Sequence, residues 1–179
     1  MSPREPADEP QRLATLDECQ ILDTPREESF DEIAQLAADL CGAPMAAVSF
    51  LDADRQWFKA RVGLPMESTP RQDAFCDHAL TGSEALVVDD VFGDPRFAAN
   101  PLVLDDPHVR FYAGVPLRLG EGSALGTLCV LDRQPRTLTA RQLAGLHREP
   151  LGGDLAARLG QVAPQPQLAH DVPGQHLQP

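Results

Sequence analysis

Lysine is almost absent from this chain, because Lys59 is the only lysine among fifteen basic residues. Acidic residues outnumber basic ones by 27 to 15, which leaves a formal net charge of −12. Nucleic-acid binding requires clustered Lys and Arg side chains that neutralise phosphates. The composition therefore argues against a nucleic-acid partner.

Long apolar runs are also missing. No stretch of eighteen apolar residues occurs, which argues against a membrane-spanning helix. The opening residues MSPREPADEP lack the apolar segment of a signal peptide, so we expect a cytoplasmic protein without membrane association. No CxxC pair is present, and in this compartment we expect reduced thiols that mostly lie in the core. The four cysteines are Cys19, Cys41, Cys76 and Cys129.

The 179 residues suffice for one domain with its own core. Residues 1–9, polar and proline-rich, are expected to form a disordered leader, and residues 10–160 the domain. Residues 161–179 are rich in Pro and Gln and are expected to form a disordered tail.

Two helices are expected near the start of the domain, the first over residues 10–22. The second has Thr24 as N-cap, Pro25 at the first helical position and Glu27 completing a capping box. Gly42 is placed to end it. Its expected apolar stripe comprises Phe30, Ile33, Leu36, Ala37 and Leu40.

The rest of the chain is mainly strand-like, which predicts an α+β fold with one mostly antiparallel sheet. A last helix is expected over 138–149 with Thr139 as its cap, although HREPLGGD interrupts any continuation. Pro95 and Pro101 are expected to open and to stop a single helical turn, in a long loop typical of a pocket lid. The expected strands are 45–51, 56–62, 84–90, 110–119 and 124–132.

Six stretches follow one another as ILDTPREESFDEIAQLAADL, AAVSFLDADRQWFKARVGL, FCDHAL, VVDDVFGDPRFAANPLV, RFYAGVPL and ALGTLCVLDRQPR. In this order, over residues 10–148, they resemble the GAF domain family. The similarity is to the bacterial type found in front of histidine kinases and diguanylate cyclases. It implies a central antiparallel sheet with packing helices, including the first and last, on one face. Loops and short helices on the other face would close a ligand pocket.

The resemblance names no ligand or cofactor, because GAF domains bind many things. Free methionine sulfoxide reductases of this fold carry cysteines in VCG-like and ACD-like contexts, of which Cys76-Asp77 is only a partial echo. Bilin-binding members attach pigment at a cysteine followed directly by histidine, and cyclic-nucleotide-binding members carry an NKFDE-type signature. Neither pattern occurs here.

The stretch FCDHAL places Cys76 and His78 two residues apart. They could be a nucleophile with its base, or two ligands of a metal site with Cys129 and His108, or two pocket linings. On a helix their side chains would diverge. We therefore favour pocket lining, with no catalytic residue and no metal.

Further ligand-binding candidates combine charge with aromatic character. Arg96 and Arg110 suit a carboxylate or phosphate ligand. The alternative is that Arg96 forms a local salt bridge with Asp94 and that Arg110 holds the loop by bonds to its carbonyls. Strand alternation puts Phe58 in the core or pocket and Trp57 with Lys59 on the surface, as a platform for a partner or, more commonly, as a solvated edge. The complete candidate set is Phe58, Phe75, Cys76, His78, Arg96, Asn100, Arg110 and Tyr112.

The sequence thus predicts a stand-alone GAF sensory or regulatory domain. It would bind a small-molecule ligand and act on a histidine kinase or diguanylate cyclase in trans, or as a homodimer. The alternatives are a thiol-based redox enzyme that uses Cys76, with Cys129 as resolving thiol, and a dimerisation module that binds no ligand. A packed interior without a cavity would favour the last of these.

Overall fold

The computed structural model describes residues 8–82, 84–119 and 122–148. Residues 1–7 of the expected leader and the whole expected tail lie outside the described residues. The helices are α1 (Glu9–Glu18), α2 (Glu28–Cys41), α3 (Phe75–Leu80), α4 (Pro101–Leu104) and α5 (Ala140–His147), with a 3-10 turn η1 (Arg71–Asp73). The strands are β1 (Met45–Leu51), β2 (Arg55–Val62), β3 (Ser68–Pro70), β4 (Leu86–Val88), β5 (Phe111–Arg118) and β6 (Ala124–Asp132).

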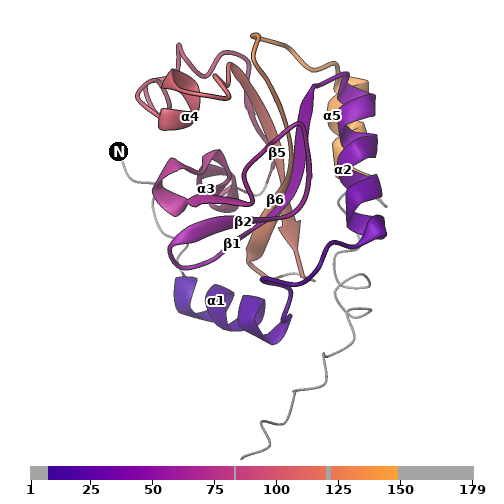
Figure 1. Ribbon diagram of the computed structural model, residues 1–179, viewed down its shortest axis with the longest axis vertical. Helices are drawn as coiled ribbons and strands as arrows, with labels where there is room; N and C mark the ends of the chain where they lie inside the picture. Colours follow the sequence, from indigo (N-terminus) through magenta and orange to yellow (C-terminus); the bar gives the residue numbers. More distant parts are fainter. Residues whose placement is uncertain (1–7, 83, 120–121, 149–179) are drawn as a thin grey trace, which may run out of the picture.

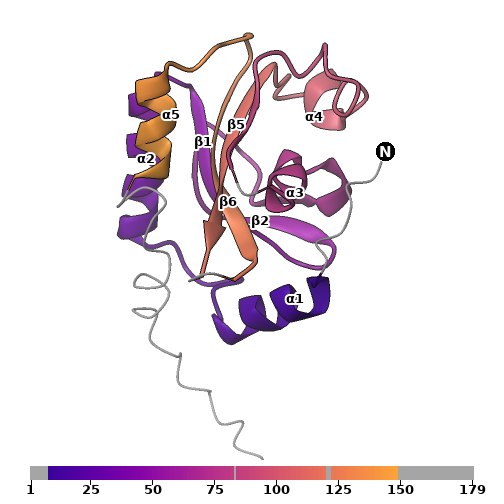
Figure 2. The ribbon, with the colours of Figure 1, turned by 180° about the vertical axis from the view of Figure 1, so that it is seen from behind.

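All six strands form one antiparallel sheet in the order β3-β2-β1-β6-β5-β4, which confirms the expected α+β architecture. Helices α2 and α5 lie side by side on one face, and α3 and α4 lie on the other (Figures 1 and 2). Helix α1 crosses the lower end of the sheet (Figure 1). Because both faces are covered, β1 and β6 are buried along their whole length.

The start of α2 differs from the expected capping box. The helix begins at Glu28, and no side chain caps it. Lys59 Nζ instead donates to Thr24 Oγ1 at 2.7 Å, to the Pro25 carbonyl at 2.7 Å and to Glu27 Oε1 at 2.5 Å. The groups expected to cap the helix therefore surround a fully buried ammonium, and the helix starts three residues later.

The expected surface platform of Trp57 and Lys59 is wrong, because both are buried. They share one face of β2, as alternation predicted, but that face packs under α2 rather than toward solvent. The side chain of Phe58 points the other way and joins the core on the α3 side.

The apolar stripe of α2 is confirmed at Phe30, Ile33 and Ala37, but Leu36 is 51% exposed. At about 100° per residue, Leu36 points roughly 120° away from the middle of the buried stripe. Gly42 ends the helix with φ 58°, as expected for a left-handed C-cap.

Helix α5 has the expected Thr139 cap, with Gln142 completing a capping box. The expectation that Pro101 stops a helical turn is wrong, because Pro101 is the first residue of α4. Asn100 is the N-cap of this helix, and its side chain accepts a hydrogen bond from Leu102 N at 2.9 Å. Proline fits a first helical turn, where its missing N–H is not needed.

Strand β3 was missed by the sequence reading, which placed it in a loop. Of the described helices, none has both the length and the apolar character needed to cross a membrane.

Candidate functional site

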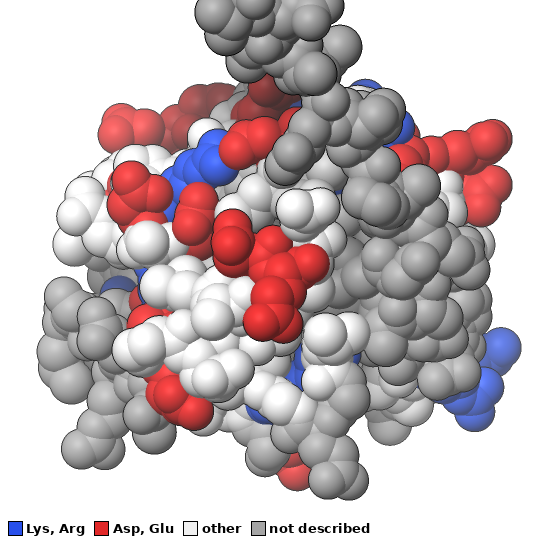
Figure 3. Space-filling view, turned by 90° about the horizontal axis from the view of Figure 1, so that it is seen from below, with Lys and Arg blue, Asp and Glu red and all other residues white. Residues whose placement is uncertain are grey.

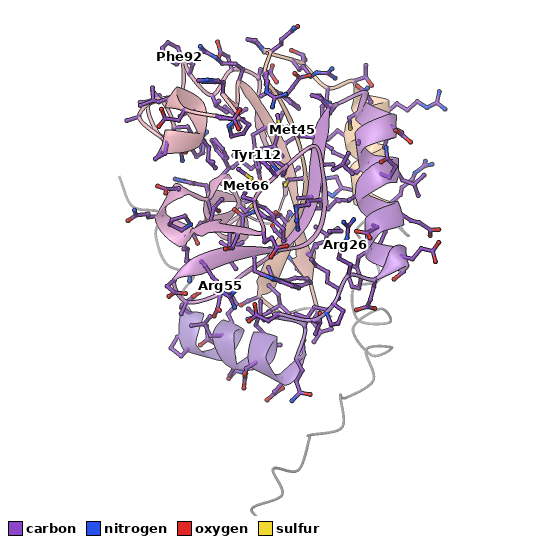
Figure 4. All side chains as sticks on the ribbon, in the orientation of Figure 1. Arg26, Met45, Arg55, Met66, Phe92 and Tyr112 are labelled. Carbon is purple, nitrogen blue, oxygen red and sulfur yellow. The ribbon has the colours of Figure 1, made fainter. Side chains whose placement is uncertain are left out.

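A small cavity lies between the sheet and the segments that cover its α3 side. Its volume is about 20 Å³, which is room for little more than one water molecule. Tyr112 from β5 and Met66 from a covering loop are two of its walls, and both are labelled in Figure 4. The lining residues are Gln56, Phe58, Leu64, Met66, Thr69, Phe75, Cys76, Leu102, Pro107, Val109, Tyr112, Cys129 and Leu131.

Two segments contribute the outer walls of this cavity, residues 63–73, which include the edge strand β3, and residues 92–109. We call them together the lid. They are joined by Asn100, whose Nδ2 donates to the Asp73 carbonyl at 2.9 Å. Asn100 therefore makes two structural hydrogen bonds, because its Oδ1 also accepts from Leu102 N and caps α4. It holds the lid without touching the cavity.

Four of the eight candidate residues line the cavity: Phe58, Phe75, Cys76 and Tyr112. The ring of Phe75 stacks on Tyr112 with centroids 5.3 Å apart and tilts against Phe97 at 5.0 Å. The other four candidates, His78, Arg96, Asn100 and Arg110, lie outside its walls.

Cys76 and His78 do not form a dyad. Helix α3 directs Cys76 toward the sheet, while His78 turns outward and meets the edge of Phe97 with centroids 4.8 Å apart. Partial burial, followed by the positive charge of Arg96, lowers the pKa of His78. The His78 imidazole therefore packs edge to face with Phe97, a residue of the lid.

Both candidate arginines are held by local contacts. Arg96 Nη2 lies 2.6 Å from Asp94 Oδ2, which is the salt bridge considered as its alternative. The Arg110 guanidinium lies over the exposed Phe92 ring at 4.2 Å, rather than on loop carbonyls.

The sulfur of Cys76 is the centre of a buried polar cluster on the sheet. Thr127 Oγ1 donates to Sγ at 2.8 Å, Gln56 Nε2 at 2.9 Å and Tyr112 OH at 3.3 Å. Ser49 Oγ is 3.6 Å from the sulfur and also contacts Thr127 at 3.2 Å. Several donors thus converge on one sulfur atom, an arrangement that favours a thiolate over a thiol.

The sequence reading missed Ser49, Gln56 and Thr127. A signal was present, because Ser49 and Thr127 are polar residues inside strongly apolar strands and face each other in the sheet register. The Tyr112 hydroxyl reaches the sulfur by crossing Gly114, where an added Cβ would lie 2.0 Å from that oxygen. Glycine at 114 is therefore needed for this hydroxyl position.

The two buried cysteines have opposite acidities. Burial alone would raise the pKa of Cys76, but hydrogen bonds from Cys129, Thr127, Tyr112 and Ser49 outweigh it and lower the pKa to about 6. The hydrogen bond to Cys76, burial and repulsion by Cys76 raise the pKa of Cys129 well above its ordinary value. Cys76 is the ionisable member of the pair, and Cys129 keeps its proton.

An ion-pair cluster connects α1 to this side of the sheet. Arg71 in η1 lies 2.6 Å from Glu9 in α1 and 2.9 Å from Asp77 in α3. Arg12 also binds Glu9, at 2.7 Å, and donates to the Leu51 carbonyl. Among the charged side chains visible at this end, acidic ones outnumber basic ones (Figure 3).

Metal-binding geometry is not found in the described ranges 8–82, 84–119 and 122–148. No group of three or more His, Cys, Asp and Glu side chains there is placed to hold an ion. His108, once considered as a distant ligand, is exposed on the lid.

Known proteins share both sequence and fold with this chain. It is 44% identical over 146 residues to the cyclic di-GMP phosphodiesterase PA2567 of Pseudomonas aeruginosa, which is 81% of this chain but 25% of that protein. The chain thus spans about a quarter of the length of this curated relative.

Two solved structures show the same fold at low identity. The GAF domain of an Acinetobacter phosphoenolpyruvate-protein phosphotransferase superposes with a TM-score of 0.62 at 20% identity, covering 84% of this chain and 93% of that one. The free methionine-R-sulfoxide reductase of Neisseria meningitidis superposes with a TM-score of 0.53 at 18% identity, covering 76% and 78%. The GAF domain family model matches residues 25–148. The chain therefore belongs to the GAF domain family.

Proposed function

We propose that this GAF domain is a regulatory module in bacterial signal transduction and that it acts in cyclic di-GMP signalling. The observation that carries the proposal is its 44% identity to a quarter of a cyclic di-GMP phosphodiesterase. A domain so similar to one region of a larger enzyme is suited to control enzymatic activity located elsewhere, in the same chain or in a partner.

The regulatory input is a small molecule that binds beneath the lid, or a signalling protein that displaces it. A cavity of about 20 Å³ is far smaller than the roughly 300 Å³ or more of ordinary ligand pockets. Binding therefore requires the lid to move outward from this closed arrangement. A ligand stabilises the open state only by its differential affinity for it.

The output follows from the position of Arg71 in the lid. Opening of residues 63–73 moves Arg71 away from Glu9 and weakens the anchoring of α1. The output element is then α1, which presents its outer surface to a partner. The partner that binds α1 and responds to its displacement would be a phosphodiesterase, a diguanylate cyclase, a histidine kinase or a second copy of the domain.

A domain replacement tests the regulatory role. The matching region of the Pseudomonas phosphodiesterase is replaced by residues 8–148 of this chain, and in a control by the Acinetobacter GAF domain of the same fold. Cyclic di-GMP hydrolysis is then measured with purified proteins. We expect near-normal hydrolysis with this chain and impaired hydrolysis with the control. Equal loss in both chimeras would overturn the proposal.

A thermal-shift screen tests the ligand. Cyclic di-GMP, GTP, amino acids and biliverdin are each added at saturating concentration to the full chain. A ligand at a hundred times its Kd stabilises the folded state by about 2.7 kcal/mol. Leu102→Trp, which fills the cavity, should abolish any such shift. A shift that persists in Leu102→Trp would place binding elsewhere, and no shift with any compound would leave a partner protein as the only input.

A further inference from the structure

We propose that Cys76 is a modification site at which hydrogen peroxide oxidises the thiolate, and that Cys129 completes a reversible disulfide. The site is independent of the proposed role in cyclic di-GMP signalling, because it needs neither a ligand in an open lid nor an enzymatic partner.

The geometry of the two thiols carries this inference. Cys76 lies on α3 and Cys129 on β6, these two elements pack together, and both side chains line the cavity. Both side chains are buried, and they reach the same small cavity from opposite walls, one from the helix and one from the sheet. Disulfide formation joins the two sulfurs at a bond of about 2.05 Å, and it can take place across this cavity of about 20 Å³.

The donors around Cys76 set the roles of the two sulfurs. The hydroxyls of Thr127 and Tyr112 and the amide of Gln56 point their hydrogens at the Cys76 sulfur. They stabilise negative charge on that atom, and the thiolate is the nucleophile in reactions of cysteine with peroxides. Cys129 remains protonated and serves as the second, resolving thiol.

The cavity limits which oxidant can react. Its volume of about 20 Å³ leaves room for little more than one water-sized molecule, which excludes bulky hydroperoxides while the lid is closed. Its walls are mainly apolar side chains, with the sulfurs among its few polar atoms. A small neutral oxidant such as hydrogen peroxide fits this space, whereas a charged one would be desolvated at high cost.

The chemistry balances in two steps. The Cys76 thiolate attacks one oxygen of hydrogen peroxide, the O–O bond breaks, and hydroxide leaves and takes a proton to become water, giving a sulfenic acid. The Cys129 sulfur then attacks the Cys76 sulfur, the S–O bond breaks, and a second water leaves with the Cys129 proton. Two thiols are oxidised, one peroxide is reduced, and a thiol reductant reverses the bond.

Oxidation changes the hydrogen bonding beneath the lid. A disulfide sulfur is a poor acceptor, so Gln56, Thr127 and Tyr112 lose their charged partner inside the protein. The disulfide also fixes α3 to β6. We therefore expect the oxidised and reduced forms to differ in the hydrogen exchange of α3 and the lid.

The test uses the full chain with the other two thiols removed, Cys19→Ser and Cys41→Ala. After hydrogen peroxide, the protein is unfolded, its free thiols are labelled with a maleimide, and its mass is measured. We expect the loss of both remaining thiols together, a mass lower by two hydrogens, and full recovery with dithiothreitol. Adding Cys129→Ala should leave a sulfenic acid at Cys76 that dimedone traps.

The wild-type chain supplies an internal control. Cys19 is more exposed than Cys76, and burial together with the charge of Glu18 raises its pKa. Peptide mapping of oxidised wild-type protein should find the Cys76–Cys129 disulfide while Cys19 is still a thiol, a result that needs no variant to fold. Oxidation of Cys19 with Cys76 and Cys129 both free would overturn the proposal. Multiple turnovers of free methionine-R-sulfoxide would also overturn it, in favour of a catalytic site.

Discussion

The guanidinium of Arg71 lies 2.6 Å from the carboxylate of Glu9, although 62 residues separate them in the chain. Both side chains are only 12% exposed. Arg71 belongs to the lid and Glu9 to α1, so one ion pair connects the cover of the cavity with the N-terminal helix. Without the Glu9 charge, Arg71 keeps only Asp77 as a carboxylate partner, and the buried Arg12 keeps only the Leu51 carbonyl.

Glu9→Gln keeps the shape of the side chain and removes its charge. We expect the free energy of unfolding to fall by about 1–3 kcal/mol and the amides of α1 to exchange faster. The matched control is Glu67→Gln, because Glu67 pairs with Arg61 at 3.3 Å but is 80% exposed. Its loss should stay below about 1 kcal/mol. Equal losses in urea denaturation would show that the α1 contact is no stronger than a surface pair.

Acid should reduce this contribution in the wild-type protein. Burial alone would raise the pKa of Glu9, but hydrogen bonds from Arg12 and Arg71 outweigh it and hold the pKa below its usual 4.5. The stabilisation is therefore complete above about pH 4.5 and disappears as the pH falls through the lower folded value. The stability difference between wild type and Glu9→Gln should shrink below pH 4.5, measured by urea titration. A difference that stays constant down to pH 3 would contradict it.

Gly114→Ala should displace the Tyr112 hydroxyl from Cys76, since the new Cβ would lie 2.0 Å from it. We expect a loss of about 1–3 kcal/mol from overpacking and a higher pKa of Cys76. Gly93→Ala is the matched control, because its nearest neighbour would be Asp90 O at 3.7 Å. Thermal unfolding distinguishes the two, and a tolerated Gly114→Ala would mean that the ring has another position available.

Asn100→Asp separates the capping of α4 by this residue from its hydrogen bond across the lid. The aspartate still accepts from Leu102 N and caps α4, but it can no longer donate to the Asp73 carbonyl. We expect hydrogen exchange to accelerate in both lid segments, with little change in global stability. Arg96→Gln, which removes an exposed salt bridge beside the same segment, should leave the exchange unchanged. If the two variants behave alike, the Asn100 bond does not hold the lid.

The peroxide reaction of Cys76 should have an unusual pH profile. The titratable groups that face its sulfur are Tyr112 on β5 and Cys129 on β6, and both have raised pKa values. With a pKa of about 6, most of Cys76 is thiolate at pH 7. The rate should rise through pH 6 and level off above pH 7. It is measured as the loss of free thiols in the Cys19→Ser, Cys41→Ala protein, which keeps Cys129 beside Cys76. Tyr112→Phe should move the midpoint upward, and a rate still rising beyond pH 8 would contradict the assignment.

The sequence by itself determined the family, the kind of each main element and four of the thirteen residues that line the cavity. Apolar periodicity, caps and turn residues act over a few positions. The end of α2 at Gly42, the start of α5 at Thr139 and the strands 45–51 and 124–132 could therefore be predicted. Phe58, Phe75, Cys76 and Tyr112 were predicted to line a pocket and line the cavity. Their role in binding stays a prediction.

Only the tertiary structure decided how buried polar groups are paired. The donors to Cys76 come from 20, 36 and 51 residues away in the chain, and the groups around Lys59 from 32 to 35 residues away. Local propensity carries no information about such partners, since a Lys or a Thr in a strand is compatible with either face. Lys59 was expected on the surface, but the folded sheet buries it, and its ammonium binds the residues that precede α2. It also made Cys76, which was expected to be a small apolar residue, the acceptor of several buried hydrogen bonds.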